Sequence, residues 1–122
     1  MPGCVLHSLA IGRVLGILNM SCDPAAASTG AQIQLGANEM SRTAQAVQVT
    51  ALDFVLSGIG PDDCVLLKLD LQACELEALL GAAVSLASLE VILMKVGFYA
   101  QPYEPPLTTL MAFLANLGLC AA

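Results

Sequence analysis

The sequence predicts an α/β fold in a single domain, and two observations support this prediction. The chain has 122 residues, of which 57% are hydrophobic and 11% charged, and this length is typical of one domain. In the second half, two apolar runs of strand length, Cys64–Leu71 and Val91–Val96, flank a helical stretch, Cys74–Leu89. Strand, helix and strand within about 30 residues are typical of a crossover that joins two parallel strands.

The first half of the chain predicts shorter elements. Three short strands are expected there: Val5–Leu9, Val14–Asn19 and one around Ile33 and Leu35. The first two lie around Gly12 and Gly16. The segment Asp23–Gly30 (DPAAASTG) is rich in turn-forming residues and predicts a loop.

The segment that joins the two halves predicts one strand and one short helix. Val47 and Val49 alternate with polar neighbours, as in a strand with one buried face. Thr50 is expected to cap the amino end of a helix over Ala51–Leu56. The segment Ser57–Asp63 (SGIGPDD) then ends the helix and turns the chain.

The strands and helix of the second half show distinct hydrophobic patterns. Cys64–Leu71 is almost continuously apolar, which is typical of a strand covered on both faces. The helix Cys74–Leu89 places four aliphatic residues on one side: Leu76, Leu79, Leu80 and Val84. Gly81 is a point at which this helix can bend or break.

The run Pro105–Ala122 is uncharged and allows two interpretations, a membrane span and a buried amphipathic helix that begins near Leu107. The helix is favoured because the apolar residues have helical spacing. These residues are Leu107, Leu110, Met111, Phe113, Leu114 and Leu117. The amino end lacks the basic and apolar regions of a signal peptide, so none is expected.

The charge distribution excludes nucleic-acid binding. Ten acidic and four basic residues give a net charge of −6. The four bases are scattered along the chain and cannot form a patch that follows a phosphate backbone. They are Arg13, Arg42, Lys68 and Lys95.

The cysteines indicate a reducing, cytoplasmic compartment. There are five, an odd number, and no CxxC motif is present. We expect reduced and mostly buried thiols at Cys4, Cys22, Cys64, Cys74 and Cys120. Because His7 is the single histidine, no metal site is expected.

The most informative charges lie in and after the strand Cys64–Leu71. Lys68 and Asp70 share one face of it, and Asp70 lies at its carboxyl end, where open parallel sheets bind ligands. Glu75 and Glu77 follow in the first turn of the helix, where the helix dipole favours anions. Two interpretations remain: a functional site, and a structural pair between Lys68 and Asp70.

The same residues carry a resemblance to a known family. LLKLDLQACELEALLGA (Leu66–Ala82) resembles the signature of FkbM-type methyltransferases, whose pattern is L-K-I-D-V-E/Q-G-x-E-L-x-V-L-x-G-A. The flanking segments VQVTALDFVL (Val47–Leu56) and VILMKVGF (Val91–Phe98) are also similar to the family, as is the pair Tyr103–Glu104. The resemblance covers nearly the whole chain in the family's order.

The resemblance implies a partial Rossmann-like methyltransferase sheet, the carboxyl-terminal half of the domain, with parallel strands, helices and an N-terminal β-hairpin. The activity it implies is S-adenosylmethionine-dependent O-methylation of a hydroxyl on a small molecule or sugar. Asp70 would position the acceptor or act as base, with Glu75 and Lys68 as further catalytic candidates. Tyr99 and Tyr103 would line the acceptor pocket, or belong to a plain surface loop.

The sequence departs from the family pattern in ways that count against intact catalysis. Ala73 replaces a glycine, and Lys95 replaces a glutamate, so we expect Asp70 to bridge Lys68 and Lys95 as a structural ion. A glycine-rich cofactor loop is absent from a credible position, because Gly36-Ala37-Asn38 lies too close to Lys68 in the sequence. We therefore expect residues 1–122 to form one partial domain that lacks the cofactor-binding strands.

Three classes of function follow, and the third is a small α/β protein that binds an apolar ligand. The first is a methyltransferase with a small-molecule acceptor and S-adenosylmethionine as donor, impaired in this chain. The second is a non-catalytic interaction module or partner subunit that forms a homo- or hetero-oligomer through an exposed sheet edge. Neither nucleic acid nor membrane is expected as a partner.

Overall fold

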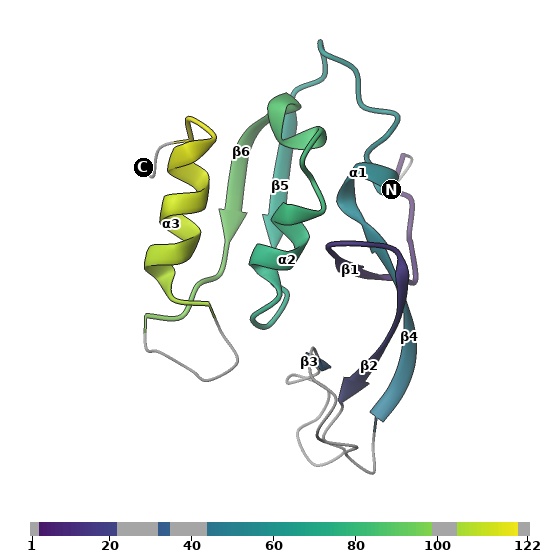
Figure 1. Cartoon of the computed structure of the whole chain (residues 1–122). Helices are drawn as coiled ribbons and strands as arrows, with labels where there is room; N and C mark the ends of the chain where they lie inside the picture. The colour runs from purple at the N-terminus through teal and green to yellow at the C-terminus, as the bar shows by residue number, and fades with distance from the viewer. Residues whose placement is uncertain (1–2, 22–31, 35–43, 99–104, 120–122) are drawn as a thin grey trace.

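The fold is α/β, as predicted, with two sheets and helices in the part of the chain that the structure describes. A computed structural model describes residues 3–21, 32–34, 44–98 and 105–119. One sheet is formed by the first half of the chain and the other by the β-α-β crossover of the second half (Figure 1). The predictions for Tyr99, Tyr103, Cys22, Cys120 and Gly36–Asn38 lie outside the described residues.

The first sheet has the strand order β1-β4-β2-β3. It contains β1 (Ala10–Gly12), β2 (Gly16–Ser21), β3 (Gln32–Gln34) and β4 (Ala44–Ala51). β1 runs parallel to β4, whereas β2 is antiparallel to both β4 and β3. The prediction of a strand over Val5–Leu9 is wrong, because the first strand begins at Ala10. β1 and β2 flank β4 rather than pairing with each other, and the antiparallel hairpin is β2 with β3.

The second sheet confirms the predicted crossover. β5 (Val65–Leu69) pairs in parallel with β6 (Leu89–Met94), and α2 (Glu75–Leu80) connects them. Gly81 ends α2, and a short 3₁₀ helix, Ser85–Ser88, leads into β6. Val65 pairs with Leu89 and Leu66 pairs with Val91, so Glu90 has no partner in β5. This irregularity in β6 leaves Leu89 buried in the core. The predicted long helix is therefore broken at the glycine.

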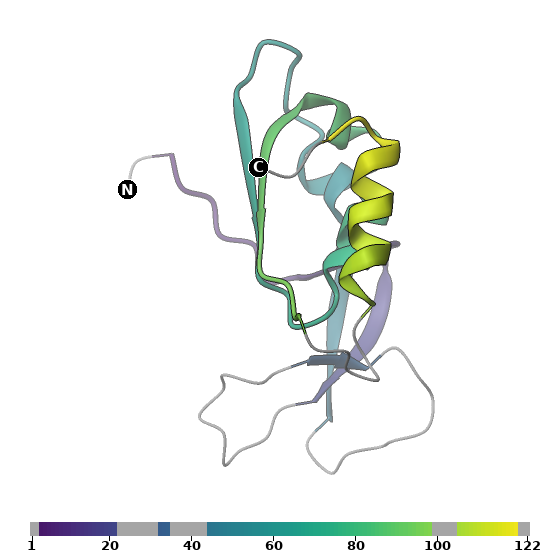
Figure 2. The ribbon, with the colours of Figure 1, turned by 90° about the vertical axis from the view of Figure 1, so that its left-hand side faces the viewer.

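The core lies on one side of the β5–β6 pair. α2 and α3 (Leu107–Asn116) cover this side (Figures 1 and 2). The buried cluster contains Leu52, Leu69, Ala78, Leu79, Ala82, Leu86, Leu89 and Leu110. Burial of such aliphatic side chains stabilises the fold by about 1.5–3 kcal/mol for each large residue.

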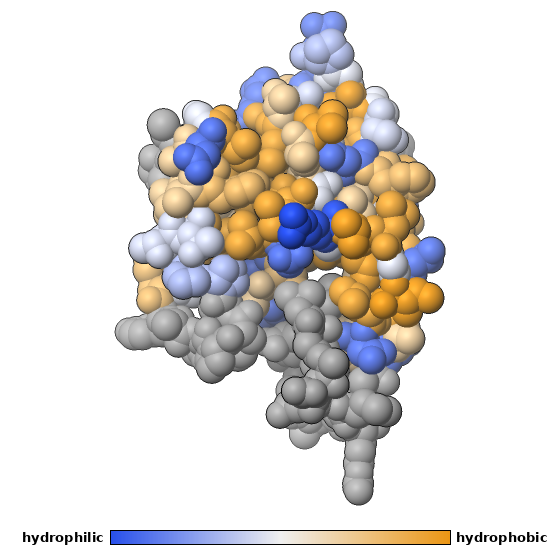
Figure 3. Space-filling model, viewed as in Figure 1, coloured by the Kyte–Doolittle hydropathy of each residue, from blue (hydrophilic) through white to orange (hydrophobic). Residues whose placement is uncertain are grey.

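The other face of the β5–β6 pair is uncovered, which corrects the expectation that β5 is buried on both faces. Leu66 is 63% exposed and Leu93 is 56% exposed. The register pairs Leu66 with Val91 and Lys68 with Leu93, so these four side chains share the open face. A second apolar surface, Val14, Leu15 and Ile17, lies exposed at the connection from β1 to β2 (Figure 3).

α3 is the amphipathic helix that the spacing predicts. It begins at Leu107, buries Leu110, and packs Phe113 and Leu114 against the core. Among the described residues, no helix is long and apolar enough to cross a membrane.

Three further expectations are wrong. Thr50 does not cap a helix, because it lies in β4 and α1 (Leu52–Val55) begins after Ala51. Its buried Oγ1 has no hydrogen-bond partner among the residues that the structure describes. Val84 is 78% exposed instead of facing the core. Of the three described cysteines, Cys4 and Cys64 are exposed and Cys74 is buried, so burial is wrong for the first two.

Gly81 lies where the backbones of the two halves of the chain meet. A Cβ atom at this position would overlap the carbonyl oxygen of Gly12 and would lie 3.1 Å from the carbonyl oxygen of Arg13. Both obstacles are backbone atoms, which cannot rotate away. The Gly81 carbonyl also accepts a hydrogen bond from the Asp53 N–H at 3.0 Å. The end of α2 therefore fixes the distance between the two sheets.

The Gly81→Ala substitution is expected to lower the free energy of unfolding by about 1–3 kcal/mol, as overpacking typically does. Urea denaturation followed by circular dichroism measures this change. Gly58→Ala is the matched control, because a Cβ at Gly58 meets nothing within 4 Å. Equal stability of the two variants would contradict the close approach.

Candidate functional site

The candidate site lies at the carboxyl end of β5. Asp70 directly follows β5, and its Oδ1 lies 3.7 Å from Nζ of Lys95, which follows β6. Both side chains are open to solvent, 47% for Asp70 and 67% for Lys95. Such an exposed ion pair stabilises a fold by at most about 1 kcal/mol. It holds the Asp70 carboxylate in place rather than removing it from reach.

Lys68 does not take part in this ion pair. It is exposed on the same face of β5 as Asp70, opposite Leu93 of β6. Within the described residues, its ammonium group makes no ion pair. The expected bridge between two lysines therefore exists for Lys95 alone, and the structural pair of Lys68 with Asp70 does not form.

The turn after β5 has an unusual backbone. Gln72 and Ala73 have φ angles of 51° and 83°, in the left-handed region that favours glycine. The Glu75 carboxylate, which is only 5% exposed, accepts a hydrogen bond from the Leu71 N–H at 2.8 Å. This bond ties the first turn of α2 to the end of β5. Glu75, which the resemblance implied as a further catalytic candidate, therefore holds the turn that directly follows Asp70.

Asp70 lies in the wall of a cavity of about 230 Å³. The cavity lies between the end of β5 and the first sheet. The other lining residues are Leu9, Ala10, Ile11, Met20, Leu71 and Gln72. Glu75 and Lys95 border a much smaller hollow of about 10 Å³ instead. Of the three predicted catalytic residues, Asp70, Glu75 and Lys68, Asp70 is the one that lines the cavity at the end of β5.

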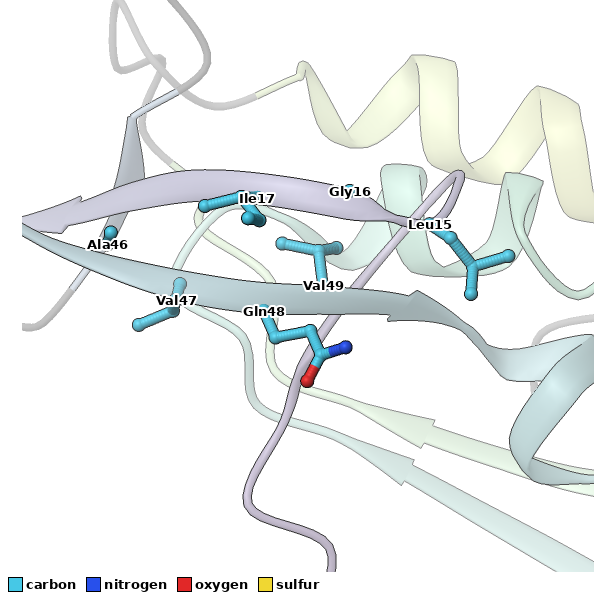
Figure 4. A pocket seen from close by; sticks show the side chains of 7 residues that line it. All are labelled: Leu15, Gly16, Ile17, Ala46, Val47, Gln48 and Val49. Atoms are coloured by element: carbon cyan, nitrogen blue, oxygen red, sulfur yellow. The ribbon is translucent and has the colours of Figure 1, made fainter.

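A larger hollow of about 440 Å³ lies over β2 and β4 (Figure 4). It is lined by Leu15, Gly16, Ile17, Ala46, Val47, Gln48 and Val49. None of these residues is charged, so the hollow offers no acid–base group.

Asp53 organises the segment behind the site. Its carboxylate accepts hydrogen bonds from the Ser85 N–H at 2.7 Å and from the Val84 N–H at 3.0 Å. Burial opposes the charged form, but these hydrogen bonds outweigh it and lower the pKa of Asp53 below its ordinary value of 3.8. Asp53 thus holds the start of the 3₁₀ helix.

The exposed thiol of Cys64 is not an activated nucleophile. The Cys64 thiol donates a hydrogen bond to Glu90 at 3.2 Å, and this bond, with the negative charge of Glu90, raises the pKa of the thiol. A raised pKa makes a thiol a weaker nucleophile at neutral pH. In the described ranges, no group of His, Cys, Asp and Glu side chains could hold a metal ion.

A comparison with protein families matches residues 2–118 to the family described as the methyltransferase FkbM domain. The chain belongs to this family. No curated protein and no solved structure matches the chain. The match extends over both sheets, α2 and α3, so the site at Asp70 lies within an FkbM methyltransferase domain.

The described residues do not fit S-adenosylmethionine, the donor that the family implies. The cavity at Asp70 has a volume of about 230 Å³. No glycine lines it, so no close backbone approach to a ligand is available there.

The Ala73→Gly substitution is expected to stabilise this FkbM domain by about 1 kcal/mol, because an L-residue with positive φ is strained and glycine is not. Chemical denaturation measures the difference. Ala87→Gly is the control, because Ala87 is an exposed residue of the 3₁₀ helix, where a glycine should lower the stability. Destabilisation by Ala73→Gly would contradict the left-handed turn.

The Asp53→Asn substitution is expected to cost about 1–3 kcal/mol at neutral pH, because charged hydrogen bonds to two backbone N–H groups are weakened. Asp53 has a lowered pKa in the folded state, so its stabilisation is present above pH 3.8 and is lost as the pH falls through the folded pKa. The stability difference between the two proteins should therefore shrink below pH 3.8. A difference that is constant down to pH 2 would contradict this role.

Proposed function

We propose that the chain provides the acceptor side of an S-adenosylmethionine-dependent methyltransferase site, in which a hydroxyl of a small molecule or sugar is methylated. The observation that carries the proposal is the position of Asp70, at the carboxyl end of a parallel strand and in the wall of a cavity. Ligands of open parallel sheets bind at this end. The family match supplies the reaction type.

Asp70 has the chemistry that an alcohol acceptor needs. A hydroxyl must lose its proton when it attacks, and a carboxylate within hydrogen-bond reach can accept that proton. The ion pair with Lys95 fixes the orientation of the Asp70 carboxylate while leaving it 47% exposed. Gln72 Nε2 lies 3.5 Å from the same carboxylate oxygen and can orient an acceptor beside it.

The donor side is proposed to be incomplete in this chain. Residues 1–122 would form a partial domain whose donor-binding strands are missing, because the cavity at Asp70 does not fit S-adenosylmethionine. Donor affinity would then be weak, and transfer would be impaired. The free, exposed thiols of Cys4 and Cys64 support a reducing compartment such as the cytoplasm.

A second candidate function is a non-catalytic interaction module. The observation that favours it is the open face of the β5–β6 pair, where Leu66, Val91 and Leu93 are each more than half exposed. β5 also has only one neighbouring strand in the described part of the chain, so its other edge is free. Exposed apolar faces and free edges are typical contact sites for another chain.

The Asp70→Asn substitution is expected to lower methyl transfer by at least about 100-fold, since a carboxamide cannot act as a base. The assay measures tritium passed from millimolar methyl-labelled S-adenosylmethionine to free hexoses by the whole chain. Transfer should rise linearly with donor concentration, without saturation. Asp62→Asn is the matched control, because Asp62 is exposed in the loop before β5.

Two results would decide against the proposal. If wild-type chain transfers no label above the protein-free blank, the proposal that this chain methylates a hydroxyl fails, although its membership of the family stands. A defined oligomer in size-exclusion chromatography would then favour the interaction module. If Asp70→Asn transfers label as fast as wild type, Asp70 is not the base.

A further inference from the structure

A pocket of about 190 Å³ lies between the first sheet and the start of α2. α2 packs beside β1 (Figure 1), so segments that are distant in the sequence border this pocket. Its floor contains Leu18 of β2 and Val49 of β4. These two side chains share one face of the sheet, because Val49 pairs with Gly16, two residues before Leu18. The floor of the pocket is therefore aliphatic.

Two opposite charges border the same pocket. Arg13, in the connection from β1 to β2, and Glu77, in the first turn of α2, both line it. Neither side chain forms an ion pair with another residue that the structure describes. Among the described lining residues, no other is charged. One small space therefore has an unpaired cation and an unpaired anion at its border.

These two charges define the chemistry of a ligand. Glu77 repels a ligand that is only negative, and Arg13 repels a ligand that is only positive. A ligand that carries both charges close together can form two charge-assisted hydrogen bonds, from the guanidinium to its carboxylate and from its ammonium to Glu77. A free α-amino acid carries both groups on one carbon atom, whereas each end of a peptide carries one of them.

The remaining lining residues indicate the side chain of that amino acid. They are not polar and none is aromatic: Ile11, Gly12, Val14, Leu18, Val49 and Cys74. A cavity of about 150 Å³ holds benzene, so a pocket of about 190 Å³ has room for an amino acid with a short aliphatic side chain. Burial of that side chain against the floor favours binding.

We propose that this pocket binds a free aliphatic α-amino acid such as leucine. Its carboxylate bonds to Arg13, its ammonium group bonds to Glu77, and its side chain lies against Leu18 and Val49. The pocket is a second binding site, separate from the site of methyl transfer, because Asp70 does not line it. The proposal therefore does not rest on the activity at Asp70.

The test is a titration of the whole chain with L-leucine, followed through ¹³C-labelled methyl groups in two-dimensional NMR spectra. Because the rim residues Arg13 and Val14 are exposed, the dissociation constant is expected near about 1 mM. The methyl signals of Leu18 and Val49 should shift, and those of Leu67 in β5 should not. If neither of the first two shifts at concentrations well above this value, the proposal is overturned.

Three further probes fix the ligand class. Isocaproate lacks the ammonium group and isoamylamine lacks the carboxylate, so each should bind about tenfold more weakly than leucine. Equal binding of either compound would overturn the charge argument. S-adenosylmethionine carries the same amino-acid group on a much larger ligand. Tighter binding of S-adenosylmethionine than of leucine would overturn the proposal, because the pocket would then belong to a donor site.

Variants assign the binding to this pocket. Arg13→Gln and Glu77→Gln should each weaken leucine binding about tenfold, since one charged hydrogen-bonding group is lost. Asp62→Asn and Lys68→Gln are the matched controls, because both remove an exposed charge that does not line the pocket. Equal losses in the controls, or no loss in the pocket variants, would overturn the assignment.

The Arg13→Gln variant also separates a direct contact from a structural effect. It should bind isoamylamine more tightly than the wild-type chain does, because the cation that repels the ammonium group is removed. Weaker binding of both leucine and isoamylamine by this variant would mean that the pocket itself is lost, and it would overturn the assigned role of Arg13.

Discussion

A single buried carboxylate determines where the site residues lie. Glu75, only 5% exposed, accepts a hydrogen bond from the Leu71 N–H at 2.8 Å and thereby connects α2 to the end of β5. The turn between them has two consecutive left-handed residues, Gln72 and Ala73, whose strain must be offset by the surrounding structure. A carboxylate bonded to a backbone N–H is strong enough to do so. Asp70, immediately before this turn, is consequently held at the edge of the cavity.

The walls of the site come from two sheets, and two contacts fix their separation. Gly81 touches the backbone of Gly12 and Arg13, so the end of α2 lies directly against the connection that follows β1. Asp53, at the start of α1 after β4, donates its N–H to the Gly81 carbonyl and accepts hydrogen bonds from Val84 and Ser85. These bonds connect the first sheet to the crossover. The cavity at Asp70, which is lined by residues of both sheets, therefore lies between two walls that these contacts connect.

Local periodicity predicted the crossover and α3, because their apolar spacing directly reflects burial. It failed where tertiary context decides. Val5–Leu9 is apolar enough for a strand, but in the structure the pairing with β4 begins at Ala10. The continuous apolar pattern of β5 correctly indicated a strand, yet Leu66 is exposed, because the described residues supply a cover for one face only. Asp70 was found from its place at a strand end. Glu75 was found from its place in the family signature, but its hydrogen bond to the Leu71 N–H depends on the left-handed turn between β5 and α2, which spacing alone does not predict.

The most direct test of the account is amide hydrogen exchange at Leu71, measured by NMR in the wild-type chain and in the Glu75→Ala variant. If Glu75 holds the turn, the Leu71 N–H is protected from exchange in the wild type. It should exchange about 10- to 100-fold faster in the variant, as expected for the loss of a charged hydrogen bond. Protection at Leu67, within β5, should change much less. Exchange of the wild-type Leu71 N–H at the rate of an unstructured peptide would contradict the account, because the turn that positions Asp70 would then not be held by Glu75.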